Sequence, residues 1–140
     1  MGLPLPPFSW EHVHPILVNF TAALMPASVF SDLWGRLLRR DSLRHAAWWA
    51  LLYAALVTPA TALSGWFWKR SVEAALSPEL IAAHQWLGLW LAFAFPVLVA
   101  WRWRFHKRGE SPGVAYFVTA VLTLLALMYQ GHVGGSMAFG

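Results

Sequence analysis

Residues 46–68 read AAWWALLYAALVTPATALSGWFW, a run of 23 residues without a single charged side chain. A helix rises about 1.5 Å per residue, so this run would be about 34 Å long, slightly more than the hydrocarbon thickness of a bilayer. Uncharged stretches of that length are typical of membrane-spanning helices. The run therefore predicts a transmembrane helix.

Three further apolar runs flank this stretch, at residues 12–34, 78–103 and 112–131. Over all 140 residues, 59% are apolar and only 11% are charged. A soluble domain has about a quarter of its residues charged, so this chain has too few to cover a surface that faces water. We expect an all-α fold, in which residues 1–140 form a single up-down four-helix transmembrane bundle. The glycine-rich tail either extends the last helix or turns back over its end.

Basic residues predict how the bundle is oriented. Of the ten Lys and Arg residues, two fall between the second and third segments, and the other eight fall between the first and second or between the third and fourth: Arg36, Arg39, Arg40, Arg44, Arg102, Arg104, Lys107 and Arg108. By the positive-inside rule, these eight face the cytoplasm. We therefore expect a multi-pass protein of the bacterial inner membrane with both termini on the outer, periplasmic side.

Composition also excludes several classes of function. The chain has no cysteine, which excludes disulfides, thiolate-held iron–sulfur clusters, zinc ribbons and covalently attached c-type haem. The basic residues follow the predicted membrane boundaries and form no patch interleaved with polar surface. We therefore expect membrane lipid as a partner and no nucleic acid.

Three of the six histidines fall at the same predicted membrane level. His14 lies at the start of the first segment, His84 lies about 9 Å along the third, and His132 lies about 28 Å along the fourth, which begins inside. Ionisable side chains are costly within membrane helices and mark candidate functional sites. Imidazoles that face each other in a bundle are a common way to hold a haem iron.

An up-down bundle suggests how these histidines pair. The first and third helices lie on a diagonal and the fourth neighbours both, so His14 and His84 can hold a porphyrin across the core, with His84 and His132 as the alternative. Gly88 follows His84 by one helical turn, and Gly131 lies beside His132. Both glycines would give a flat macrocycle room near the backbone.

Other interpretations of the polar residues remain open. The histidines could serve only to bond one helix to another, as Asn19 and Thr21 are expected to do. If residues 11–14 are extended, His12 and His14 point the same way, and a copper or zinc site with His84 and His132 becomes conceivable.

The remaining two histidines lie beside arginines at the inner boundary. His45 and His106 are expected to be solvated there. A second cofactor site between them is the weaker alternative, and the neighbouring arginines are expected to anchor the helices at the anionic inner leaflet.

Three short motifs resemble a bacterial family of four-helix membrane domains of largely unknown function. They are HPILVNF at 14–20, AHQWLG at 83–88 and QGHVGG at 130–135. Some family members are fused to Rieske or c-type cytochrome domains, so the resemblance implies membrane electron transfer with bound haem b. It also implies that His14, His84 and His132 are ligands. The family often reads His-Pro-x-x-Val-His-Phe-Pro, whereas Asn19 and Thr21 replace its second His and last Pro here, which puts a second haem in doubt.

The leading hypothesis is an integral-membrane b-type haem-binding electron-transfer protein, or such a subunit of a larger redox complex, with its haem near the periplasmic face. Its partners would be membrane or periplasmic redox subunits of the c-type cytochrome or Rieske kind. Quinone binding is conceivable, but nothing in the sequence supports it. The spans contain no carboxylate pair for acid–base chemistry, so an electron-transfer subunit is favoured over a stand-alone enzyme. The alternatives are a cofactor-free structural subunit and a copper- or zinc-binding membrane protein.

Overall fold

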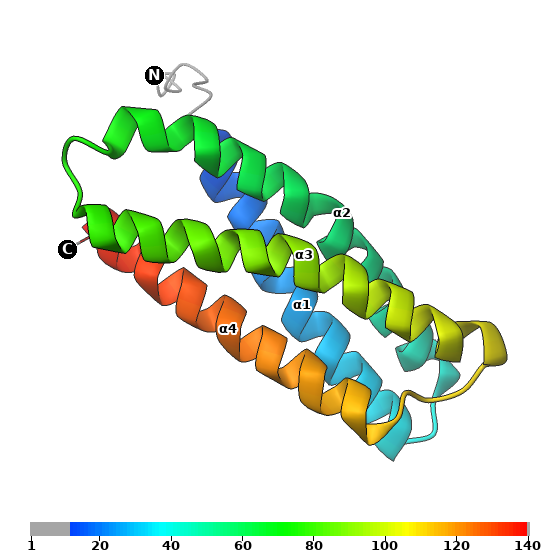
Figure 1. Ribbon diagram of the computed structural model, residues 1–140. Helices are drawn as coiled ribbons and strands as arrows, with labels where there is room; N and C mark the ends of the chain where they lie inside the picture. Colours follow the sequence, from blue (N-terminus) through cyan, green and yellow to red (C-terminus); the bar gives the residue numbers. More distant parts are fainter. Residues whose placement is uncertain (1–11, 140) are drawn as a thin grey trace, which may run out of the picture.

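The computed structural model describes residues 12–139, which form four helices and no strand (Figure 1). The helices are α1 (Val13–Leu37), α2 (Asp41–Val72), α3 (Pro78–Arg108) and α4 (Val114–Phe139). All four are long and apolar enough to cross a membrane. The predicted all-α transmembrane bundle is confirmed.

Successive helices run in opposite directions, and each packs against its neighbour in the sequence (Figure 1). Helix α4 closes the bundle against α1, so α1 and α3 lie on a diagonal. We call the end where α1 begins and α4 ends the terminal end; it also carries the loop at 73–77. The opposite end, with the loops at 38–40 and 109–113, is called the basic end. The positive-inside rule assigns the terminal end to the outside, and this orientation stays a prediction.

Each helix ends three to eight residues later than hydropathy predicts, and α2 also begins five residues earlier. Local chemistry explains the ends of α3: Pro78 occupies its first turn, the Ser77 hydroxyl accepts from the Leu80 N–H at 3.4 Å, and Gly109 ends it with a left-handed φ of 65°. Proline in the first turn and a left-handed glycine at the end are favourable helix boundaries. The glycine-rich tail continues α4 as far as Phe139.

The bundle has an apolar interior and an apolar exterior. Its core is a cluster from all four helices that includes Met25, Leu51, Phe95 and Tyr116. Many large apolar side chains on the outside are more than half exposed, among them Phe20, Phe67, Trp86, Phe93 and Met128. A surface of this kind is compatible with lipid rather than water.

A buried ion pair crosses the diagonal near the basic end. Arg102 of α3 donates to Asp32 of α1 through two hydrogen bonds, Nε to Oδ2 at 2.9 Å and Nη2 to Oδ1 at 2.8 Å. The two side chains are only 1% and 2% exposed. The expectation that Arg102 belongs to an inner loop is therefore wrong. Its neutralising carboxylate lies 70 residues away in the sequence.

Candidate functional site

Two of the three predicted ligands meet inside the terminal end. His14 lies in the first turn of α1 and is 8% exposed, while His84 lies half-buried in the second turn of α3. Their ring centroids are 6.5 Å apart, and the ring planes stand at 80°. The diagonal arrangement of α1 and α3 thus brings two imidazoles together, edge to face, inside the bundle.

Helix α2 holds the His14 ring and determines its tautomer. His14 Nδ1 lies 3.1 Å from the Thr61 carbonyl oxygen and 3.0 Å from Ser64 Oγ. A carbonyl oxygen can only accept, and the Ser64 hydroxyl donates to that same carbonyl at 2.8 Å. Nδ1 must therefore carry the proton in the neutral ring. The lone pair is left on Nε2, which is the atom a ligating histidine presents to a metal.

The backbone of α2 approaches the same ring closely at Gly65. A Cβ atom added at this position would lie 2.8 Å from His14 Cε1, closer than real Cβ contacts allow. Trp68 covers the ring one turn further along, with centroids 5.4 Å apart. His14 is thus held from one side by a glycine, a tryptophan and two hydrogen-bond partners.

The surroundings of His84 are less complete. Within residues 12–139, His84 Nδ1 is buried without a hydrogen-bond partner, and so is Gln130 Oε1. Gln130 Nε2 donates to the His84 carbonyl oxygen at 2.9 Å. Each unpaired buried polar atom costs about 1–3 kcal/mol, and such atoms often mark a place where a further group binds. The described residues therefore leave two buried hydrogen-bonding atoms at this site without a partner.

Helix α4 approaches His84 through a glycine. A Cβ atom added at Gly134 would lie 3.1 Å from His84 Cε1, and one added at Gly88 would lie 3.2 Å from Gln130 Nε2. At Gly131, by contrast, an added Cβ would meet nothing within 4 Å among the described atoms. Side chains thus pack closely against Gly88 and Gly134 but not against Gly131, and the expectation that Gly88 and Gly131 give a macrocycle room stays a prediction.

His132 does not join the other two histidines. Gln130 and Gly134 face His84, and His132 is two residues from each, so it points about 200° away around α4. Its ring is exposed and lies against Tyr129, with centroids 6.5 Å apart. The alternative pairing of His84 with His132 is therefore not formed in this structure: membrane depth was considered, but rotation about the helix axis was not.

The other polar residues of α1 divide between the interior and the surface. Thr21 is buried and bonds to the Leu17 carbonyl at 3.3 Å and to Thr61 Oγ1 of α2 at 3.4 Å, as expected for an interhelical group. Asn19 is exposed, so the same expectation was wrong for it. His12 is exposed as well. Among residues 12–139, no three His, Asp or Glu side chains gather as metal ligands, so the copper or zinc alternative has no cluster to support it.

A separate histidine pair lies at the basic end. The rings of His45 and His106 are 5.6 Å apart, and His106 stacks on Trp48 at 4.6 Å. His106 follows His84 by 22 residues of continuous helix, or about 33 Å. His106 borders an apolar groove of about 790 Å³ between α2 and α3, and the pair forms no part of the terminal-end site.

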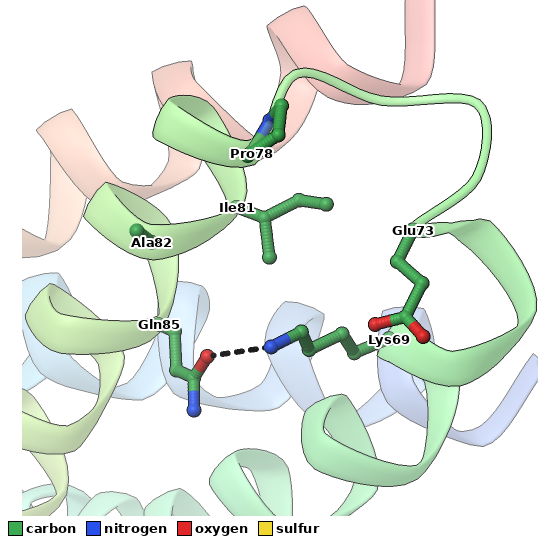
Figure 2. A pocket seen from close by; sticks show the side chains of 6 residues that line it. All are labelled: Lys69, Glu73, Pro78, Ile81, Ala82 and Gln85. Carbon is green, nitrogen blue, oxygen red and sulfur yellow. Dashed lines mark hydrogen bonds between the residues drawn. The ribbon is translucent and has the colours of Figure 1, made fainter.

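A small hollow opens beside the terminal-end site, between the last turns of α2 and the first turns of α3 (Figure 2). It measures about 300 Å³ and is lined by Lys69, Glu73, Pro78, Ile81, Ala82 and Gln85. Lys69 and Gln85 point toward each other across it, and the Lys69 ammonium donates to Gln85 Oε1 at 3.3 Å. The only feature of the sequence that could have indicated this hollow is the small number of charged residues around the loop between α2 and α3.

Comparison with known proteins agrees with a membrane bundle. The chain belongs to the family described as "Predicted membrane protein (DUF2231)", which matches residues 11–140. No curated protein and no solved structure matches it. The chain is therefore a multi-pass membrane protein by both its family and its fold.

Proposed function

We propose that this membrane protein binds one b-type haem between His14 and His84 and passes electrons as a subunit of a larger membrane redox complex. The observation that carries the proposal is the meeting of two imidazoles, from diagonal helices, inside the terminal end of the bundle. Bundles of this kind build cofactor sites from side chains on facing helices.

The spacing of the two rings fits a shared metal ion. Bonds from imidazole nitrogen to a transition metal are about 2 Å long, so two rings on opposite sides of one ion have centroids about 6 Å apart. The observed separation is 6.5 Å. His14 already presents the Nε2 lone pair, because its Nδ1 proton is given to the Thr61 carbonyl. Among the described residues, no group forms a hydrogen bond with Nδ1 of His84, so no such bond would have to break for this ring to bind a metal.

Glycines let the neighbouring helices pack closely against the pair. Gly65, Gly88 and Gly134 replace side chains where α2, α3 and α4 approach His14, Gln130 and His84. The first turns of α1 and α3 would have to move apart to admit a macrocycle, and glycine neighbours offer little steric resistance to that movement. Bound haem would supply a one-electron redox couple whose potential depends on its axial imidazoles and burial.

The location of the pair suggests where electrons would leave. If the terminal end is periplasmic, His14 and His84 lie within the first turns below the outer boundary. A c-type cytochrome or Rieske domain on that side would then be close enough to accept electrons. The bundle itself has small loops and contributes no acid–base pair at this end, which suits a subunit rather than a separate enzyme.

A redox difference spectrum tests the proposal. The protein is purified in mild detergent from cells supplied with a haem precursor, as wild type, His14→Ala, His84→Ala and His132→Ala. We expect a reduced b-type spectrum in wild type and His132→Ala and its loss in the other two variants. A wild-type protein without a Soret band, or a spectrum that survives both substitutions unchanged, contradicts the proposal.

The same experiment distinguishes a second candidate, a cofactor-free structural subunit. The hydrogen bonds from His14 to Thr61 and Ser64 favour it, because they join α1 to α2 without any ligand. In that case His14→Ala would lower the stability of the purified protein, and no preparation would carry haem.

A further inference from the structure

We propose that the hollow at the terminal end is a carboxylate-binding subsite, in which Lys69 pairs with the propionate carboxylates of a porphyrin. This inference rests on the proposed haem binding and adds a recognition role that the histidines cannot supply. The argument depends on the position of Lys69, on its charge and on what surrounds it.

Lys69 lies one helical turn beyond the glycine that packs against the His14 ring. It follows Gly65 by four residues on α2, so it lies on the same helix face, about 6 Å nearer the helix end. Gly65 is the residue that contacts the His14 ring. On the other wall, Gln85 follows His84 directly on α3. The hollow is therefore flanked by the neighbours of both proposed ligands (Figure 2).

The charge of Lys69 has no carboxylate partner among the residues that the structure describes. Its hydrogen bond goes to a neutral amide oxygen, Gln85 Oε1, at 3.3 Å. Both ion pairs found in residues 12–139, Asp41–Arg44 and Asp32–Arg102, lie toward the basic end. A half-buried ammonium at the membrane boundary is stabilised by an anion, and a charge-assisted bond to carboxylate is stronger than one to an amide.

Porphyrin propionates match this site in chemistry. Haem b bears two carboxylates on one edge of an otherwise apolar ring. If that edge faced the hollow, the Lys69 ammonium would pair with these carboxylates, and the Gln85 amide would donate to them through its nitrogen. Ile81 and Ala82 supply apolar lining beside the charged end.

Glu73 weakens the binding of a carboxylate in the proposed subsite. This exposed carboxylate lines the same hollow four residues beyond Lys69, just past the end of α2 (Figure 2). It repels an incoming carboxylate, so its removal strengthens binding if the hollow has the proposed role. Substitution of Lys69 and substitution of Glu73 should therefore change the affinity for the same ligand in opposite directions.

Porphyrin titration tests the subsite directly. Full-length protein produced without added haem is titrated in detergent with iron protoporphyrin IX and with its dimethyl ester, which lacks the two charges, and the Soret band is followed. We expect wild type to prefer the free acid. Lys69→Gln should weaken binding of the free acid about tenfold and leave the ester unchanged. Glu73→Gln should strengthen binding of the free acid only.

Arg70→Gln is the matched control, because Arg70 is the adjacent basic residue but is exposed and does not line the hollow. It should leave both affinities unchanged. The subsite is refuted if Lys69→Gln changes both porphyrins alike or neither, or if Arg70→Gln has the same effect. If wild type binds both porphyrins equally well, only the subsite fails; if it binds neither, the haem proposal fails and the subsite falls with it.

Discussion

At the scale of single residues, the site depends on glycines that let helices approach imidazole rings. Gly65 is the tightest case, since an added Cβ would lie 2.8 Å from His14 Cε1. The ring cannot easily retreat, because its Nδ1 is bonded to Thr61 and Ser64 on the same helix. The position of His14 is therefore sensitive to a single methyl group on α2.

Gly65→Ala should destabilise the protein and weaken haem binding. Overpacking of this kind costs about 1–3 kcal/mol, and displacement of the ring breaks the hydrogen bonds of His14 Nδ1 with Thr61 and Ser64. The measurement is unfolding in mixed detergent micelles, together with haem content. The control is Gly131→Ala, where the new methyl meets open space and improves helix propensity by up to about 1 kcal/mol. Equal stability for the two variants would contradict the packing described for Gly65.

A second prediction at this scale concerns Gln130, whose amide oxygen has no hydrogen-bond partner among the described residues. Gln130→Leu removes the bond to the His84 carbonyl and the unpaired Oε1 together, so we expect stability to change by less than about 1 kcal/mol. In the haem-loaded protein we expect a shifted reduced spectrum, because the surroundings of His84 become apolar. An identical spectrum would show that Gln130 has no influence on the ligand.

At the scale of helices, the Asp32–Arg102 pair joins α1 to α3 across the bundle, far from the histidine pair that the same two helices carry at the terminal end. Arg102 Nη2 also approaches the Arg44 carbonyl oxygen of α2 at 3.4 Å. Arg36 donates to the Pro112 carbonyl at 2.8 Å, which connects α1 to the loop before α4. The basic end thus contains the buried ion pair, whereas at the terminal end the helices are joined by hydrogen bonds of neutral histidine and glutamine groups and by close packing at glycines.

Asp32→Asn should cost about 3–5 kcal/mol, because it leaves the Arg102 guanidinium buried without a counter-charge. The double variant Asp32→Leu with Arg102→Met should recover most of this loss, since an apolar pair needs no compensation. Unfolding in mixed micelles measures both. Asp41→Asn, which breaks the exposed pair with Arg44, serves as the control and should cost less than about 1 kcal/mol. If Asp32→Asn alone were as stable as wild type, the buried pair would not be formed.

At the scale of the whole molecule, the bundle is apolar on nearly all its outer faces, and its two ends differ in charge. The basic end carries most arginines, and the terminal end carries Lys69 and Arg70. Because the exposed aromatic and aliphatic side chains need lipid or another membrane subunit to cover them, the bundle is stable only in a membrane or an assembly within one.

The orientation of the bundle can be measured with single introduced cysteines, since the natural chain has none. Ala75 and Glu110 are exposed in the loops of opposite ends. In intact spheroplasts, a membrane-impermeant maleimide should label Ala75→Cys directly, and Glu110→Cys only after permeabilisation. The reverse pattern would place the histidine pair at the cytoplasmic side and exclude a periplasmic electron acceptor.

The sequence alone determined the number of helices, their approximate limits and the membrane environment. These properties depend on hydropathy and helix length, which are local and can be read along the chain. The depth of a residue in the membrane also depends only on its position along its helix. Counting residues was therefore enough to predict the levels of His14 and His84.

Only the tertiary structure decided which side chains meet. The rotation of each helix about its axis is set by packing against its neighbours, and a rotation of half a turn separates a ligand from a lipid-facing residue. His132 lies at the right depth on the wrong face, whereas Gly134 lies on the face toward His84. Asp32 and Arg102 pair across the diagonal for the same reason, because the fold rather than the sequence brings them together.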